Sequence, residues 1–442
     1  MTVEDLLPPP PVTTSTRART DRLSSVLAPR GAWTTLAEHR SRFAPPPATD
    51  RRPDDALIDA VERAGLHGRG GAGFPTAVKL RAVAAGRRRP IVLANGSEGE
   101  PASSKDALLM SKAPHLVLDG ALLAASAVGA DQVIVGVKVG AGRAREAIGR
   151  ALEERYEKEP WTPRVRVVDV PPRYLAGEER ALVNLINRGR AIPPAGTSRP
   201  FEHGVAGRPT LVQNVETLAR VKAAIADPEG YRRGETTLVT LWGDVRRPGV
   251  HEVRLGTPLG RVIDGPGGGA TEPVGLVFPG GPAGAPLPAS DLDVPFEPES
   301  LREKGTALGT GAVLVVGASA CPLAVAASVA GFFERENCGQ CPPCAVGTAS
   351  LARILRAVES GAARPRDVDD LHEVAGFMSG HGHCAHCRTA AAVATGMARG
   401  LADAVRAHVN GAGCPGLRHP DPFAPGSAER AAVEAAVEEQ LR

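Results

Sequence analysis

Aromatic side chains are scarce in this chain of 442 residues, where phenylalanine, tryptophan and tyrosine together contribute 3%. Proteins that hold single-stranded nucleic acid stack its bases on aromatic rings, and duplex binders carry strongly basic surfaces. The formal net charge here is only +3, from 52 basic and 49 acidic residues. We therefore expect neither a nucleic acid nor an anionic membrane surface as a partner.

Cysteine is missing from residues 1–320, and all seven cysteines lie after residue 320. An odd number of cysteines, several of them at metal-type spacing, does not suit a disulfide framework and indicates a reducing compartment. The N-terminal stretch Met1–Pro8 has neither the basic nor the apolar segment of a secretory signal. We therefore expect a cytoplasmic protein.

One uncharged stretch, residues 311–333, has the length of a membrane-spanning helix. Its character changes part-way, however, because Ala312–Val316 is typical of a short buried strand and Gly317–Pro322 of a turn. An alanine-rich helix follows. We predict a buried strand and helix in this stretch, and no transmembrane segment.

The predicted elements divide the chain into four parts: a disordered or extended arm, an α/β domain, a β-rich module, and a strand followed by a helical region, at residues 1–50, 51–232, 233–305 and 306–442. The arm is rich in proline, threonine and arginine. The α/β domain is predicted from strands at 90–94, 132–137 and 165–170 that alternate with helices at 54–64, 115–129 and 142–157. Helices are also predicted at 323–335, 345–359, 366–378, 388–409 and 427–441.

The most specific motif is a group of four cysteines, Cys338, Cys341, Cys344 and Cys384. Three thiolates at C-x2-C-x2-C spacing can surround one metal centre, and the fourth closes it, as in a [4Fe–4S] cluster with four cysteine ligands. A zinc site is the alternative, because Cys384 lies in a segment that is also rich in histidine. Cys387 competes with Cys384 as the fourth ligand.

A glycine-rich loop spans Gly65–Thr76 and contains the G-x-G-x-x-G pattern. We reject a Rossmann pyrophosphate loop, because that motif follows a strand and this one follows a predicted helix. A loop with so many glycines still allows backbone amides to approach a phosphate or a flat ring, with Arg69 and Lys79 supplying positive charge. The alternative is a flexible surface loop.

Two acidic segments, Asn95–Glu100 and Gly177–Glu179, are candidate ligand contacts. The first follows the carboxyl end of a predicted strand, where α/β sheets bind ligands. An asparagine can hydrogen-bond the edge of a ring, and a carboxylate can hold ribose hydroxyls. Taken singly, each segment is equally typical of a solvated acidic loop.

Together these motifs resemble the 51 kDa-type flavoprotein subunit of respiratory complex I, a module also found in NAD-reducing hydrogenases and NAD-dependent formate dehydrogenases. The resemblance covers roughly residues 54–400. It rests on ordered matches to the family patterns GLRGRGGAGFPTGLK, NADEGEPGTFKD, GEETAL, KPTTVNNVET, GTGAVI, ESCGQCTPC and CALGDAAA, at residues 65–79, 95–106, 177–182, 208–217, 309–314, 336–344 and 384–392. The last match favours Cys384 as the fourth ligand.

The resemblance implies an FMN-binding α/β domain, a ubiquitin-like β-grasp domain and a C-terminal helical bundle that carries the iron–sulfur cluster. It implies that FMN is held by Gly68, Arg69, Gly70, Lys79, Asn95, Gln213 and Asn214. It also implies that the nicotinamide nucleotide site is lined by Phe74, Glu100, Glu178 and Glu179. Glu98 and Gly177, which lie in the same motifs, complete the expected cofactor-binding set.

The implied activity is that of an NADH dehydrogenase (quinone)-type oxidoreductase, in which a hydride passes from NADH to FMN and single electrons pass to the cluster. No protein side chain acts as a nucleophile. The implied partners are a ferredoxin-like or [2Fe–2S] subunit and further electron-transfer subunits. The implied location is cytoplasmic, or peripheral on the inner face of a membrane complex.

Three positions depart from the family pattern around the adenine of NADH. Ala82 stands where the family has an aromatic residue, and Gly196 and Arg199 stand at a lysine and a phenylalanine. A flavin and iron–sulfur protein that serves a ferredoxin-like partner without productive NADH binding is therefore a second hypothesis. A zinc-stabilised scaffold without redox function is a third. Cys321 is expected to be a buried small side chain, and Cys414 has no predicted partner.

Overall fold

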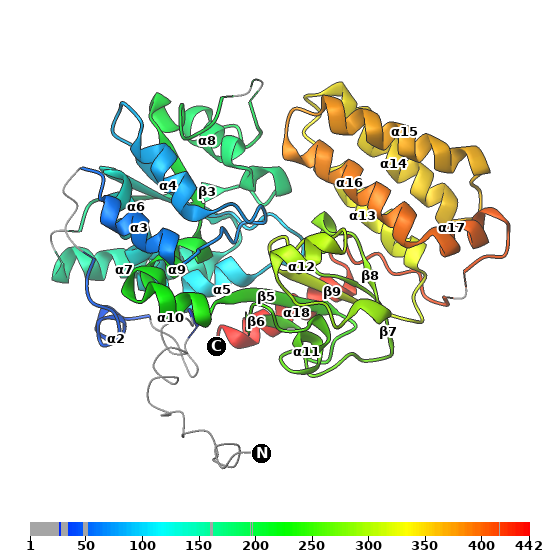
Figure 1. Ribbon diagram of the computed structural model, residues 1–442, viewed down its shortest axis with the longest axis horizontal. Coiled ribbons are helices and arrows are strands. Elements are labelled where there is room, and N and C mark those ends of the chain that lie inside the picture. Colours follow the sequence, from blue (N-terminus) through cyan, green and yellow to red (C-terminus); the bar gives the residue numbers. More distant parts are fainter. Residues whose placement is uncertain are drawn as a thin grey trace, which may run out of the picture.

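The computed structural model describes residues 26–27, 34–46, 52–159, 162–194, 196, 198–414 and 416–442. Figure 1 shows three groups of elements: a parallel sheet with helices, a second sheet below and beside it, and a bundle of long helices. The order of these groups along the chain agrees with the α/β, β-rich and helical parts expected from the sequence. The predicted domain limits themselves stay predictions.

The first sheet has four parallel strands in the order β3-β2-β1-β4. They are β1 (Ile91–Gly96), β2 (Gln132–Lys138), β3 (Val165–Val170) and β4 (Thr210–Asn214). The strands expected at 90–94, 132–137 and 165–170 are confirmed. Runs of valine, isoleucine and leucine form this sheet because parallel strands covered by helices are buried on both faces.

The helices of this first part are α3 (Asp55–Arg63), α4 (Thr76–Ala84), α5 (Lys105–Lys112), α6 (Pro114–Val128), α7 (Gly142–Lys158), α8 (Glu179–Arg188), α9 (Val215–Ala226) and α10 (Pro228–Arg233). All residues of α6 are buried. A Cβ atom at Gly120 would lie 1.8 Å from the carbonyl oxygen of Leu218, so α6 and α9 approach closely there. Glycine permits this approach because it has no side chain.

The second sheet has five strands in the order β6-β5-β9-β7-β8. They are β5 (Thr236–Gly243), β6 (Gly249–Arg254), β7 (Val274–Phe278), β8 (Leu287–Pro288) and β9 (Ala312–Gly317), with α11 (Leu259–Asp264) and α12 (Pro298–Glu303) beside them. β9 pairs in parallel with β5 and antiparallel with β7. The limit predicted between residues 305 and 306 stays a prediction, but β9, which was expected with the helical region, pairs within this sheet.

The helical bundle consists of α13 (Pro322–Glu336), α14 (Pro342–Glu359), α15 (Pro365–His381), α16 (Ala385–Gly400) and α17 (Ala402–Val409). The single helix expected at 388–409 is two helices that break at Leu401, whose φ and ψ of −115° and 23° are not helical. The last helix, α18 (Ala428–Gln440), leaves the bundle and packs on β5 and β6. Its Gln440 side chain hydrogen-bonds both backbone groups of Val250.

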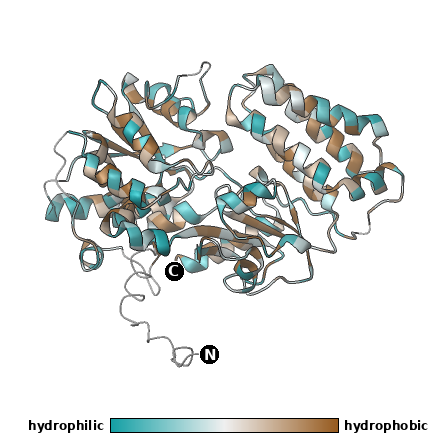
Figure 2. Ribbon diagram, viewed as in Figure 1, coloured by the Kyte–Doolittle hydropathy of each residue, from teal (hydrophilic) through white to brown (hydrophobic). Residues whose placement is uncertain are grey.

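The uncharged stretch at 311–333 forms β9 and most of α13, as predicted. Among the described residues, no single helix is long and apolar enough to cross a membrane; the bent pair α5 and α6 passes that test only jointly, by length and composition. In Figure 2 apolar residues lie along the strands of both sheets, while the bundle helices carry polar and apolar residues.

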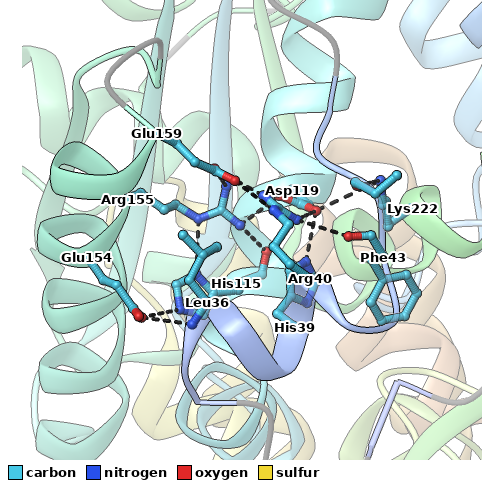
Figure 3. Close-up of polar contacts among 11 residues, drawn as sticks. Leu36, His39, Arg40, Phe43, His115, Asp119, Glu154, Arg155, Glu159 and Lys222 are labelled. Atoms are coloured by element: carbon cyan, nitrogen blue, oxygen red, sulfur yellow. Dashed lines mark hydrogen bonds and ion pairs between the residues drawn. The ribbon is translucent and has the colours of Figure 1, made fainter.

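The described part of the predicted arm is ordered, so the prediction of an extended arm is wrong for residues 34–46. The helix α2 (Leu36–Arg40) packs against α6 and α7. Residues 34–46 are ordered because a buried ionic network attaches them to the first domain (Figure 3). Most of residues 1–33, and residues 47–50, lie outside the described residues.

At the centre of that network is Asp119, which has no exposed side-chain surface. Its carboxylate accepts hydrogen bonds from Arg155 (2.7 Å), Arg40 (2.8 and 3.1 Å) and, through its Nε2 atom, His39 (2.8 Å). Burial alone would raise the pKa of Asp119, but these donors hold it well below its usual range. The carboxylate is therefore ionised and balances cations that come from two distant segments.

We predict that Asp119→Asn lowers the stability of the folded chain strongly, because it leaves the fully buried Arg155 with only its more distant carboxylate partner, Glu159 at 3.4 Å. Removing one member of a buried ion pair costs about 3–5 kcal/mol. The matched control is Asp59→Asn, which removes a partner of Arg81 in a pair that is about half exposed and should change stability by less than about 0.5 kcal/mol. Urea unfolding midpoints measure both, and equal midpoints would contradict the prediction.

Candidate functional site

The candidate cofactor residues gather where β1 and β4 end. The two strands are parallel neighbours, and Asn95 on β1 lies in register with Asn214 on β4. The glycine loop, which connects α3 to α4, passes over this edge. A Cβ atom at Gly70 would lie 3.3 Å from the Cβ of Asn214, and one at Gly68 would lie 3.8 Å from Nε2 of Gln213. The glycines therefore let the loop backbone approach the strand ends closely.

The loop is held by its own backbone. The Gly68 amide donates to the Phe74 carbonyl at 2.9 Å, and the Thr76 amide donates to the Leu66 carbonyl at 2.9 Å. Gly71 and Gly73 have φ of 103° and 61°, which residues with a side chain adopt rarely. The Phe74 ring at the tip is 52% exposed, so its face is available to a ligand.

The acidic loop after β1 is also fixed. Glu98 has φ of +40°, an uncommon conformation for a residue other than glycine and one that clusters at functional sites. Its carboxylate accepts the backbone amides of Asp106 and Ala107, each at 3.0 Å, at the start of α5. Glu98 therefore caps the start of α5. Because its carboxylate is occupied in this way, it is not free to bind a cofactor.

Glu100 has a different environment. It is 9% exposed, and its Oε2 accepts a hydrogen bond from the Thr310 hydroxyl at 2.5 Å. Burial raises the pKa of Glu100 to about 7, while the Thr310 hydrogen bond and the Lys105 charge oppose that rise. Its charge therefore changes near neutral pH. Sequence analysis did not single out Thr310, although it lies in the matched GTGAVI stretch.

The second acidic segment joins the first. Asn95 donates from Nδ2 to the Gly177 carbonyl at 2.9 Å. The Glu178 carboxylate caps α8 by accepting the amides of Arg180 and Ala181. Glu179 forms an ion pair with Lys79, with 2.9 Å between Nζ and Oε2. The structure thus brings Lys79, Asn95, Gly177 and Glu179 together, as the sequence predicts for one site.

Arg69 is placed differently from the prediction. Its guanidinium is 2% exposed and forms an ion pair with Glu235 at 2.5 Å, at the start of the second sheet. Arg69 also lines a polar cavity of about 360 Å³. Among the described residues, no other predicted site residue lines this cavity. The backbone of Arg69 belongs to the glycine loop, and its amide donates to the Thr217 hydroxyl at 2.8 Å. Its side chain points away from the loop to Glu235.

A network of buried charged side chains stabilises the end of β4. Asn214 donates from Nδ2 to Asp106 at 2.7 Å, and Lys105 pairs with Asp106 at 2.7 Å and with Glu216 at 2.9 Å. Burial alone would raise the pKa of Glu216, but Lys105 and Arg220 lower it to about 2. These charged residues were not predicted as a group, although Lys105, Asp106 and Glu216 all lie in matched family stretches.

The four predicted cysteine ligands lie at the beginnings of two bundle helices. Cys341 is the N-cap residue of α14 and Cys344 lies in its first turn, while Cys384 is the N-cap residue of α16. Cys341, Cys344 and Cys384 are buried and Cys338 is partly buried. Burial raises the pKa of Cys384, and the nearby Glu178 and Cys338 add to the rise. Bound iron would remove these thiol protons outright.

Cys387 is fully buried, and its thiol donates to the Met378 carbonyl at the end of α15 at 3.4 Å. Its thiol also lies within hydrogen-bonding reach of Cys344. Cys384, by contrast, is the N-cap residue of α16. The partial positive charge of a helix N-terminus stabilises a thiolate ligand, which suits the ligand role that the motif match gives Cys384.

The residues present fit both cofactors. Glycines at 68, 70, 71 and 73 leave this part of the loop almost without side chains, so a flat ring could approach its backbone. Four cysteines, the number that a [4Fe–4S] cluster takes, lie at or just before two helix N-termini. Residues 61–223 match the family described as the Nuo51 FMN-binding domain, and residues 324–408 match the NADH-ubiquinone oxidoreductase-F iron-sulfur binding region.

Curated relatives agree over most of the chain. It is 30% identical over 387 residues to one of the NADH-quinone oxidoreductase F subunits of Rhizobium meliloti, covering 82% of this chain and 90% of the relative. It is 34% identical over 355 residues to the F subunit of the Escherichia coli enzyme, covering 75% of this chain and 79% of the relative. The chain belongs to this family of NADH-quinone oxidoreductase F subunits. The resemblance stated from the motifs is therefore confirmed.

Among solved structures, the air-oxidised NAD+-reducing [NiFe]-hydrogenase is similar, with a TM-score of 0.72 and 30% sequence identity. The match covers 86% of this chain and 66% of the hydrogenase chain. Ala82 in α4 is partly buried, and Gly196 and Arg199 are exposed. The aromatic rings of the family pattern are thus missing at Ala82 and Arg199, and its lysine is missing at Gly196.

We predict that Cys384→Ser removes the iron–sulfur cluster, whereas Cys387→Ser keeps it, because a serine at 387 can still donate to the Met378 carbonyl. The measurement is iron content of anaerobically purified protein, expected at about four per chain for the wild type and for Cys387→Ser. Loss of iron in Cys387→Ser with retention in Cys384→Ser would reverse the ligand assignment.

Proposed function

We propose that the chain is the NADH-oxidising flavoprotein subunit of an NADH:quinone oxidoreductase-type complex. The observation that carries this function is the close approach of Gly70 to Asn214, in register with Asn95, within a family that binds FMN and iron–sulfur. When bound, FMN supplies acceptance of an electron pair from NADH and its release as single electrons, which the cluster carries onward.

The protein's own contribution is to position the flavin. The amides of Gly68 and Arg69 are bonded within the protein, to Phe74 and Thr217. The amides of Gly70 and Gly71, at the same loop, can donate to phosphate or ring oxygens. Asn95, Gln213 and Asn214 are held rigidly, since Asn95 bonds Gly177 and Asn214 bonds Asp106. Side chains fixed in this way hold a ring in one orientation without paying for ordering when it binds. Arg69 would act by fixing the loop through Glu235, and not as a phosphate contact.

A continuous set of contacts joins the flavin site to the cysteine centre. A Cβ atom at Gly99 would lie 2.7 Å from the Tyr174 carbonyl oxygen, so the acidic loop packs directly on the Tyr174 turn. The Tyr174 amide donates to Glu336 at 3.0 Å, two residues before Cys338. The Tyr174 ring packs on Phe333 and His386. This dry, packed region is the route we propose for single electrons.

The nucleotide side is open. Phe74 exposes half of its surface, and Glu178, Glu179 and Lys79 are each partly exposed. We propose that NADH lies against Phe74, with its ribose hydroxyls toward Glu100 and Glu179. Without aromatic rings at 82 and 199, adenine stacking is weaker by on the order of 1 kcal/mol for each missing ring.

The second sheet supports a β-grasp proposal, because a hairpin (β5, β6) is followed by a helix (α11) and the last strand (β9) pairs in parallel with the first. We further propose a ferredoxin-like or [2Fe–2S] partner subunit and a peripheral position on the cytoplasmic face of a larger complex. The relatives named as NADH-quinone oxidoreductase subunits and the hydrogenase neighbour support such an assembly.

Anaerobic titration of the purified protein with NADH tests the proposed activity. The expected result is bleaching of the flavin absorbance at micromolar to low millimolar NADH, followed by reduction of the cluster. The second candidate, electron exchange with a ferredoxin-like protein, is favoured by the exposed Arg199 and by Ala82. Flavin that stays oxidised at millimolar NADH but is reduced by a low-potential ferredoxin would support that candidate and contradict the first.

We predict a pH dependence of NADH binding from Glu100. Only the ionised carboxylate accepts two ribose hydroxyl hydrogens, so the KM for NADH should rise as the pH falls through about 7, the pKa of Glu100. Glu100→Gln should raise the KM and remove this dependence. Thr310→Val removes a hydrogen bond that lowers this pKa, so its profile should move to higher pH. An unchanged profile in both variants would exclude Glu100 from nucleotide binding.

A further inference from the structure

A second group of possible metal ligands lies away from the four cluster cysteines. The ligand atoms of Cys321, His408 and Cys414 all lie within 4.8 Å of one another. They come from separate places in the chain: the residue before α13, the last turn of α17, and the connection between α17 and α18. Neither the flavin site nor the cysteine centre uses any of these residues.

The orientation of the His408 ring favours a metal. Its Nδ1 lies 2.9 Å from the backbone carbonyl of Glu359, which can only accept a hydrogen bond. Nδ1 must therefore carry the proton, and Nε2 has a free lone pair that points toward Cys321 Sγ at 3.9 Å. A histidine that donates its other nitrogen to a carbonyl is the usual arrangement of a metal ligand. His408 is 4% exposed, so bulk water has little access to its Nε2 atom.

Both sulfurs are placed to bind a cation. Cys321 is fully buried at the N-cap of the 15-residue helix α13. Burial and the contact with Cys414 raise the pKa of the Cys321 thiol to about 11, so a bound cation would displace its proton. The Cys414 sulfur accepts the Gly416 amide at 3.3 Å. Amide donors and a helix N-terminus stabilise negative charge on sulfur. Cys414 is only partly buried, which leaves an entry path for an ion.

We propose that Cys321, His408 and Cys414 bind one Zn²⁺ ion, with water at the fourth position. Tetrahedral bonds of about 2.3 Å to sulfur and 2.0–2.1 Å to nitrogen place ligand atoms roughly 3.6 Å apart, close to the 3.9 Å between Cys321 and His408. Two thiolates and an imidazole are a zinc-type ligand set. This site is independent of the proposed function.

The ion would attach the C-terminal segment to the junction between the sheet and the bundle. Cys321 already donates its amide to the Arg418 carbonyl at 2.7 Å, and Arg418 forms an ion pair with Asp244 at 2.8 Å. Beyond that point the chain continues to α18, which packs on β5 and β6. Zinc here would hold α13, α17 and this segment together as a structural site.

The test uses the full-length holoprotein, purified without oxygen and supplied with equimolar Zn²⁺ before desalting. We expect about one zinc per chain beside the cluster iron. Cys414→Ser, which changes one partly buried sulfur to oxygen, should lose this zinc and keep iron, flavin and NADH oxidation. The control His372→Gln, an exposed histidine on α15, should keep the zinc.

X-ray absorption at the zinc edge of the wild type supplies a readout that needs no variant. Two sulfurs at about 2.3 Å and one nitrogen at about 2.0–2.1 Å are expected. Three results would overturn the proposal: no zinc retained by the wild type, full zinc retention by Cys414→Ser, or a Cys321–Cys414 disulfide found by mass spectrometry of the anaerobic protein.

Discussion

The close approach of the glycine loop to the end of β4 is the constraint on which the site depends. At Gly70 the two backbones are so near that a Cβ atom would lie 3.3 Å from the Asn214 side chain. Because β1 and β4 are parallel and adjacent, Asn95 and Asn214 lie at the same edge of the sheet. The acidic loops converge at this same edge, and we expect a flat ring to lie against it, beside the glycine loop.

That edge is stabilised by charges that are satisfied inside the protein. Lys105 is 1% exposed and is balanced by Asp106 and Glu216. Glu216 also accepts the Leu238 amide of β5 at 2.9 Å, so the network that supports Asn214 reaches the second sheet. A buried charge without its partner costs several kcal/mol. The flavin site and the second sheet are therefore linked energetically, although they are distant in sequence.

The sequence predicts the parts of this structure that depend on local patterns. The buried strands, the C-x2-C-x2-C motif and the two acidic loops are each recognisable within a short segment. Long-range partners are not recognisable in that way: Arg69 pairs with Glu235, 166 positions away, and Asp119 attaches α2 to α6 from 79 positions away. Two features of the structure differ from the expectations for this reason. A polar arm becomes ordered, and β9 joins an earlier sheet, only through partners elsewhere in the chain.

The most direct test of the account is an experimental structure of the holoprotein with FMN and its cluster. The account predicts flavin density beside the Gly68–Gly71 backbone at the ends of β1 and β4, with Asn95 and Asn214 in contact. It also predicts iron within the group of Cys338, Cys341, Cys344 and Cys384. A flavin bound elsewhere, such as in the cavity beside Arg69 and Glu235, would contradict the assignment of the strand ends as its site.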